Sequence, residues 1–117
     1  MEIVEISSAL ELATFEGPGQ WMILRVRGEI DLSTAKRVQS AFDSLIESGH
    51  RHLIADLDGV SFMDSTGISV LALTLSQVRK HEGDLKVVCR QGPARMVLAA
   101  SGMESELGVS DELPPEE

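Results

Sequence analysis

Residues 52–83 constrain the fold more than any other part of the sequence, because the spacing of their apolar residues changes partway along. Residues 53–57 form an apolar run of strand length, and the Asp58-Gly59 pair after them is a turn signal. From Ile68 onward, apolar residues recur every three or four positions, which is typical of a helix buried along one face. This stretch therefore predicts a strand, a polar turn and a long amphipathic helix. The apolar stripe of that helix is Ile68, Leu71, Ala72, Leu75 and Val78.

The polar turn, residues 63–67, carries the signals of a helix start. Asp64 is well placed as the N-cap, because its carboxylate can accept from the free backbone N–H groups of Thr66 or Gly67, a contribution of about 1 kcal/mol. Basic residues fall in the last turn of the predicted helix, and Gly83 is suited to end it in a left-handed conformation. Start and stop signals therefore agree.

Ser65 lies in the first turn of this helix, with its hydroxyl near the surface, and two interpretations compete. The first is a tolerated first-turn residue beside an N-cap, and position alone favours it. The second is a phosphoryl acceptor, because free N–H groups at a helix start favour the added charge of about −1.5 to −2. The choice between them depends on features outside the turn.

Composition predicts one globular domain. A chain of 117 residues with 43% hydrophobic residues is long enough to bury roughly two-thirds of its unfolded surface. We assign residues 1–110 to this domain. Residues 111–117 hold four acidic residues, two prolines and no basic residue, so we expect an acidic, disordered tail.

The charge and cysteine content exclude several function classes. The net charge of −9 argues against nucleic acid or an anionic membrane as a partner, because both are bound through Lys and Arg. No apolar run approaches the roughly 18 residues of a membrane span, and the N-terminus lacks the basic start of a signal peptide. We therefore expect a cytoplasmic protein. Cys89, the only cysteine, cannot form an internal disulfide or a thiolate cluster, and we expect it in the core.

The rest of the chain alternates between strand and helix patterns. We predict one strand within residues 3–15, a hairpin partner at 21–27 that Gly28 ends, and a short final strand near 107–109. A strand at 84–89 precedes a short helix that Gly92-Pro93 opens and Gly102 closes. The remaining helix is capped by Asp31 or Ser33, ends at Gly49 and buries Ala35, Val38, Ala41, Phe42, Leu45 and Ile46. The predicted fold class is α/β, a mixed sheet of four to five strands with three to four helices packed against it.

Acidic residues fall where three loops are expected at strand ends, so an enzyme has to be considered. Asp31, Asp58 and Asp64 could hold a metal ion, yet there is no glycine-rich phosphate loop and no catalytic lysine motif. A serine hydrolase usually has a Gly-x-Ser-x-Gly elbow, whereas this serine lies in Asp-Ser-Thr-Gly. We therefore expect no catalysis, metal or cofactor, and the aspartates are better explained as caps.

Two segments, Gly-Glu-Ile-Asp at 28–31 and Asp-Leu-Asp-Gly-Val-Ser-Phe-Met-Asp-Ser-Thr-Gly at 56–67, resemble the STAS domain of bacterial anti-sigma factor antagonists. The likeness extends over residues 10–109. In that family the serine matching Ser65 is phosphorylated by an anti-sigma factor that is itself a Ser/Thr kinase. The unphosphorylated form binds this kinase and releases the sigma factor, and a PP2C-type phosphatase resets the switch.

The resemblance implies that Ser65 is the phosphoacceptor, with Thr66 as a minor second one. It also implies a partner-binding surface, made of Asp31, Asp64, Ser65, Thr66 and Gly67. Two alternatives remain. One is a STAS interaction module of a transporter or a larger signalling assembly, and the other is a small enzyme that uses the aspartates with a metal.

Overall fold

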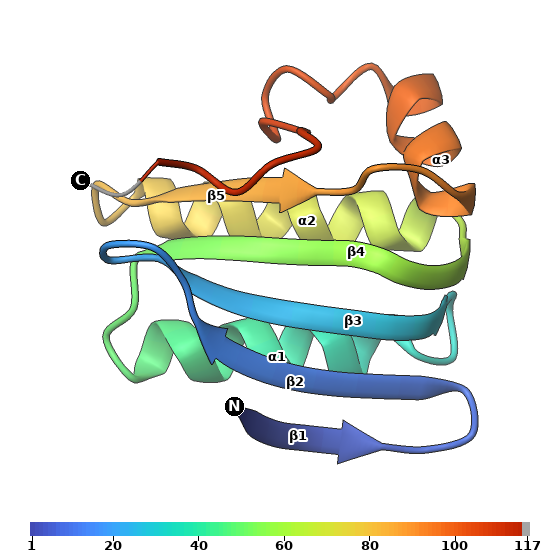
Figure 1. Cartoon of the computed structure of the whole chain (residues 1–117), viewed down its shortest axis with the longest axis horizontal. Coiled ribbons are helices and arrows are strands. Elements are labelled where there is room, and N and C mark those ends of the chain that lie inside the picture. Colours follow the sequence, from blue (N-terminus) through green and yellow to red (C-terminus); the bar gives the residue numbers. More distant parts are fainter. Residues whose placement is uncertain (116–117) are drawn as a thin grey trace.

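The computed structural model describes residues 1–115, which form one mixed five-stranded sheet and three helices (Figure 1). The fold class predicted from the sequence is confirmed. The strands are β1 (Glu2–Ile6), β2 (Leu10–Glu16), β3 (Met22–Ile30), β4 (His52–Met63) and β5 (Asp84–Val88). The helices are α1 (Ala35–Glu47), α2 (Ser65–Arg79) and α3 (Pro93–Ser101).

The strands lie in the sheet in the order of the sequence. β1, β2 and β3 pair antiparallel, whereas β3, β4 and β5 pair parallel. The predicted hairpin is the β2–β3 pair. Helices α1 and α2 follow the parallel strands β3 and β4, lie on the same face of the sheet and begin at the same end of it (Figure 1). The two turns that lead into these helices therefore meet at one edge of the molecule.

The helix faces that pack on the sheet largely match the predicted stripes. Helix α1 buries four of its six predicted residues and packs Ala35 and Ile46 at the margin of the core. In α2 the buried face also includes Val70 and Thr74, while Ile68 and Ala72 are only half-buried. The cause is α1, which packs alongside α2 and donates a hydrogen bond of 3.3 Å from Gln39 Nε2 to Thr74 Oγ1.

Strands β3 and β4 run further than predicted, past two turn signals. Gly28 does not end β3, which continues to Ile30 with Gly28 at φ +110°. A glycine is needed there because a Cβ would lie 2.2 Å from the backbone oxygen of Ala9. The Asp58-Gly59 pair is not a turn but part of a bulge in β4, since Arg25 pairs with Asp56 while Arg27 pairs with Gly59. Pairing with the neighbouring strand outweighs the local turn preference.

Both termini of the domain differ from the sequence prediction. The single strand expected in residues 3–15 is two strands, β1 and β2, joined by a turn in which Ser7 Oγ accepts from the backbone N–H of Leu10. The short strand expected near 107–109 is reduced to one bridge between Val88 and Ser110. The Ser7 hydroxyl bonds the backbone of Leu10, three residues further on, and so forms a turn between the two strands that the apolar pattern does not reveal.

Helix α2 ends differently from the prediction. The residue with left-handed backbone is Glu82 (φ 62°), not Gly83. Gly83 is required for another reason, because a Cβ there would lie 2.0 Å from the backbone oxygen of Arg51. The backbone N–H of Gly83 still closes the helix by donating to Val78 O at 2.8 Å.

The C-terminal segment is irregular as far as the structure describes it. Asp111 Oδ1 lies 3.4 Å from Arg95 Nη1, which ties the start of the acidic tail to α3. Residues 116 and 117 lie outside the described residues, so disorder of residues 111–117 stays a prediction. Within residues 1–115, each helix is too short or too polar to cross a membrane.

Candidate functional site

The turn between β4 and α2 is built around Asp64. Its backbone is extended, and its Oδ1 accepts from the backbone N–H of Thr66 at 2.9 Å. The predicted N-cap is therefore confirmed. The same oxygen accepts from the Thr66 hydroxyl at 2.5 Å, so one carboxylate oxygen holds both the backbone and the side chain of Thr66.

Ser65, the first residue of α2, is exposed. Within residues 1–115 no hydrogen bond engages its hydroxyl, although its backbone oxygen accepts from Ser69 Oγ at 3.2 Å. A free hydroxyl at a helix start lies where backbone N–H groups and the helix dipole favour added negative charge. Thr66 is half-buried with its hydroxyl bonded to Asp64, so two adjacent hydroxyls have different environments.

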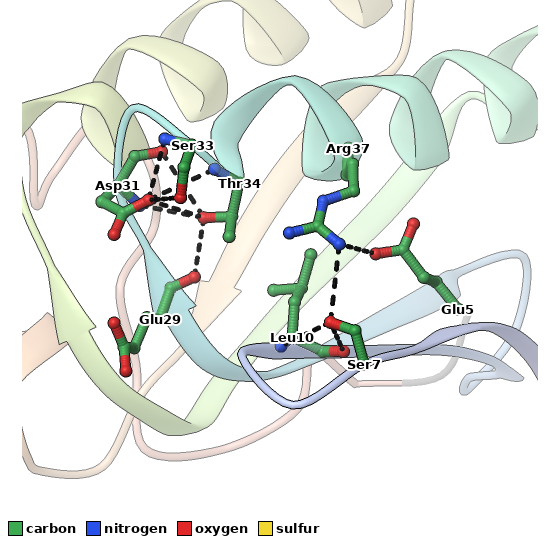
Figure 2. A network of polar contacts seen from close by, with 8 residues as sticks. All are labelled: Glu5, Ser7, Leu10, Glu29, Asp31, Ser33, Thr34 and Arg37. Atoms are coloured by element: carbon green, nitrogen blue, oxygen red, sulfur yellow. Dashed lines mark hydrogen bonds and ion pairs between the residues drawn. The ribbon is translucent and has the colours of Figure 1, made fainter.

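The neighbouring turn, between β3 and α1, is built around Asp31 (Figure 2). Asp31 Oδ1 accepts from Ser33 Oγ at 2.7 Å and from the backbone N–H groups of Ser33 and Thr34 at 2.9 and 3.2 Å. These bonds, the Ser33 hydroxyl first, hold the pKa of the Asp31 carboxyl below its usual value. The prediction that Asp31 or Ser33 caps α1 is wrong, because the N-cap residue is Thr34 and it makes no side-chain cap bond. Asp31 is instead the acceptor of the turn before the helix, and Ser33 is a donor to it. Asp31 therefore carries its negative charge at neutral pH.

The two turns are held side by side by backbone pairing. Ile30 pairs with Met63 at the ends of β3 and β4, and the backbone N–H of Asp64 donates to Ile30 O at 3.2 Å. Because Asp31 follows Ile30 and Asp64 follows Met63, this pairing brings the two aspartates to the same end of the sheet. Gly67 lies buried beneath the turns, where a Cβ would come within 2.6 Å of Met63 Sδ. It allows the start of α2 to pack closely and does not itself form the surface.

Asp58 does not join these two aspartates, contrary to the sequence expectation. It lies within β4 and forms an ion pair with Arg90, whose backbone N–H also donates to Asp58 Oδ1 at 2.7 Å. The cause is the extension of β4 to Met63, which moves the end of the strand away from Asp58. Among residues 1–115 no group of three His, Cys, Asp or Glu side chains could hold a metal ion.

An apolar cleft of about 450 Å³, which was not predicted from the sequence, lies beside the Ser65 turn. Its exposed apolar members are Leu32, in the turn after β3 and 83% exposed, and Leu73, on α2 and 51% exposed. An exposed leucine in an otherwise polar turn was the available signal. The cleft is lined by Leu32, Ala35, Lys36, Gln39, Thr66, Ser69, Val70 and Leu73.

The family model described as STAS domain matches residues 10–114. A Staphylococcus aureus (strain NCTC 8325) protein named anti-sigma-B factor antagonist is 28% identical over 65 residues, which span 56% of this chain and 60% of that protein. The match to this relative therefore covers less than two-thirds of its length.

Solved structures share the fold. An anti-sigma factor antagonist from Mycobacterium paratuberculosis has a TM-score of 0.81 at 24% identity, covering 94% of this chain and 92% of its own. The anti-sigma factor antagonist SpoIIAA in its unphosphorylated form has a TM-score of 0.71 at 20% identity, covering 87% of this chain and 88% of its own. SpoIIAA in its phosphorylated form, described as a Bacillus cell fate determinant, has a TM-score of 0.65 at 19% identity, covering 86% and 92%.

Proposed function

Because the chain belongs to the STAS domain family, we propose that it is an anti-sigma factor antagonist that is switched by phosphorylation of Ser65. The unphosphorylated form binds an anti-sigma factor with Ser/Thr kinase activity, and the sigma factor is released. A PP2C-type phosphatase restores the binding form. The names of the relatives support the first part of this proposal, and a solved phosphorylated form of SpoIIAA supports the second.

The free hydroxyl of Ser65 is the single observation on which the proposal depends. It is exposed and lies at the start of α2, where a kinase can reach it without unfolding the helix. Its neighbour Thr66 donates its own hydroxyl to Asp64, which makes Thr66 at most a minor acceptor. The surface that would contact the partner comprises Asp31, Asp64, Ser65 and Thr66, with Gly67 shaping it from below.

A phosphate on Ser65 would change binding rather than fold. The helix start attracts the added dianion, while the carboxylates of Asp31 and Asp64 repel it, so the two effects oppose each other on an exposed turn. A partner packed on this turn would have to bury the dianion, and an unpaired buried charge costs several kcal/mol. Phosphorylation therefore releases the partner without unfolding the domain.

The protein acts in this scheme by binding and not by catalysis. Asp58 is paired with Arg90 away from Asp31 and Asp64, which removes the arrangement that a metal-dependent enzyme would have used. The net charge of −9 favours a protein partner over nucleic acid or an anionic membrane. A sigma factor acts on transcription, so we place the protein in the cytoplasm.

The test is phosphorylation by candidate kinases from the same genome, followed by mass spectrometry of the product. We expect phosphate on Ser65, no incorporation in Ser65→Ala at that site, and retained kinase binding by that variant. Ser65→Asp should bind more weakly. Ser76→Ala, which removes an exposed serine further along α2, is the matched control and should behave as wild type.

Two results would contradict the proposal. One is wild-type phosphate incorporation in Ser65→Ala at a residue other than Thr66. The other is affinity that does not change between Ser65 and Ser65→Asp. Recovery of a transporter instead of an anti-sigma factor in a pull-down would favour the alternative of a STAS module in a larger assembly.

A further inference from the structure

The apolar cleft near Ser65 lies between the N-terminal halves of α1 and α2. Because both helices begin at the same end of the sheet (Figure 1), the cleft opens at the edge of the molecule where the two aspartate turns meet. Thr66, which lines the cleft, directly follows Ser65 in the chain. A partner seated on the Ser65 turn is therefore within one residue of the cleft lining.

The lining of this cleft differs from that of the rest of the surface. Four other surface clefts each contain at least two charged side chains, whereas Lys36 is the only charged residue in this one. Leu32 and Leu73 stand exposed on opposite sides of it, one from the turn before α1 and one from α2. Exposed leucines around a concave apolar floor are typical of a site that a protein partner covers.

Two acidic side chains, which we call the acidic edge, adjoin the cleft in the chain: Asp31 directly precedes Leu32, and Asp64 lies two residues before Thr66. Lys36 lines the cleft itself. Asp31 and Asp64 each use Oδ1 to accept hydrogen bonds from their own turns, and within residues 1–115 no donor reaches either Oδ2. Two carboxyl groups with one unoccupied oxygen each are suited to a basic side chain that approaches from outside. They are unsuited to a second copy of this chain, because its own acidic edge and its charge of −9 would repel them.

We propose that this cleft receives an apolar side chain of the anti-sigma factor, from a segment whose adjacent basic residue pairs with Asp31 and Asp64. This inference rests on the proposed function and names the part of the surface that carries the binding energy. Leu32 and Leu73 are the anchors, and the two aspartates set the orientation of the segment. Apolar contact next to Ser65 also excludes water from the turn, which makes a phosphate there costly to bury.

The first test removes the anchors one at a time, as Leu32→Ser and Leu73→Ser. Both residues are exposed, so we expect thermal unfolding close to that of wild type. We expect each variant to raise the dissociation constant for the anti-sigma factor about tenfold, which is the usual cost of losing an interface anchor. The KM for phosphorylation of Ser65 should rise by a similar factor with kcat unchanged.

The matched control is Ile6→Ser, which removes a 66% exposed apolar side chain from β1 at the far edge of the sheet. It should leave both constants unchanged. Asp31→Asn tests the acidic edge, because the amide oxygen can still accept the bonds of Oδ1. The association rate of wild type should fall as salt is added, and that of Asp31→Asn should fall less steeply.

The outcomes separate this inference from the proposed function. If Leu32→Ser and Leu73→Ser bind like Ile6→Ser while Ser65 is still phosphorylated, the docking site is wrong and the switch stands. If the wild type neither binds the anti-sigma factor nor is phosphorylated by it, both the docking site and the proposed function are wrong. A wild-type dimer in sedimentation that Leu73→Ser dissociates would overturn the assignment of the occupant in favour of a second copy.

Discussion

The hydroxyl of Thr66 donates a 2.5 Å hydrogen bond to Oδ1 of Asp64, the same oxygen that caps α2. This bond distinguishes two hydroxyls that are adjacent in the sequence. Thr66 is held to the cap and half-buried, whereas Ser65 is exposed at the helix start.

Asp64 should therefore determine which hydroxyl is phosphorylated. In Asp64→Ala the Thr66 hydroxyl loses its acceptor, and we expect the share of phosphate on Thr66 to rise from a trace to a detectable fraction. Site-resolved mass spectrometry after incubation with the kinase measures this share. Asp64→Asn keeps an oxygen acceptor and is the control. An equal split between Ser65 and Thr66 in the wild type would contradict the argument.

The same substitution should destabilise the domain. Loss of an N-cap costs about 1 kcal/mol, so Asp64→Ala should lower Tm by about 4 °C in a domain of this size. Asn is as good an N-cap as Asp, and Asp64→Asn should unfold close to wild type. A Tm for Asp64→Ala equal to that of wild type would mean that the cap bond contributes nothing to stability.

Alanine substitutions at Gly28 and Gly49 separate the energetic cost of backbone strain from the cost of crowding by neighbouring atoms. Both have positive φ, at +110° and +99°, but a Cβ at Gly28 would meet Ala9 O at 2.2 Å, whereas one at Gly49 meets nothing within 4 Å. We expect Gly49→Ala to cost about 1 kcal/mol from backbone strain. Gly28→Ala should cost at least about 2 kcal/mol more, because backbone atoms have to move. Chemical denaturation measures both, and equal costs would contradict the close approach of Ala9.

The pH dependence of stability should report the turn around Asp31. The pKa of its carboxyl is lowered from the usual 3.8 by the hydrogen bonds of Ser33 and Thr34. A lowered pKa means that the folded state favours the ionised form, so the stabilisation is present above pH 3.8 and is lost as pH falls through the lower folded value. The difference in free energy of unfolding between wild type and Asp31→Asn should therefore shrink on acidification. A difference that grows toward low pH would contradict the assigned hydrogen bonds.

Cys89 should be unreactive in the folded protein. It is buried, as the sequence predicts, and burial raises the pKa of its thiol, with the Asp58 carboxylate adding to the rise. A thiol reagent should modify it slowly under native conditions and rapidly after denaturation. Ser65→Cys places a thiol on the exposed turn and provides the fast-reacting control. Rapid modification of native Cys89 would show that the segment directly after β5 opens readily.

Local signals in the sequence were sufficient for the elements nearest the site. The cap at Asp64, the helix that follows it and the exposed position of Ser65 depend on residues within a few positions of one another, and the structure confirms each. The buried face of that helix was predicted only in part, since Leu71, Leu75 and Val78 are buried but Ile68 and Ala72 are half-buried. The phosphorylation of Ser65 and the residues that contact a partner stay predictions.

Tertiary structure decided what depends on distant residues. The local sequence at Asp58-Gly59 predicts a turn, but this pair forms a bulge in β4 because β4 pairs with β3 on both sides of it. Asp58 therefore lies away from the site and pairs with Arg90. Leu32 and Leu73 are far apart in sequence, and only the packing of α1 against α2 brings them to one cleft. Strand pairing and helix packing act between segments whose contact no local pattern records, so the sequence determined the hydroxyl and its helix, and the fold determined the surface around them.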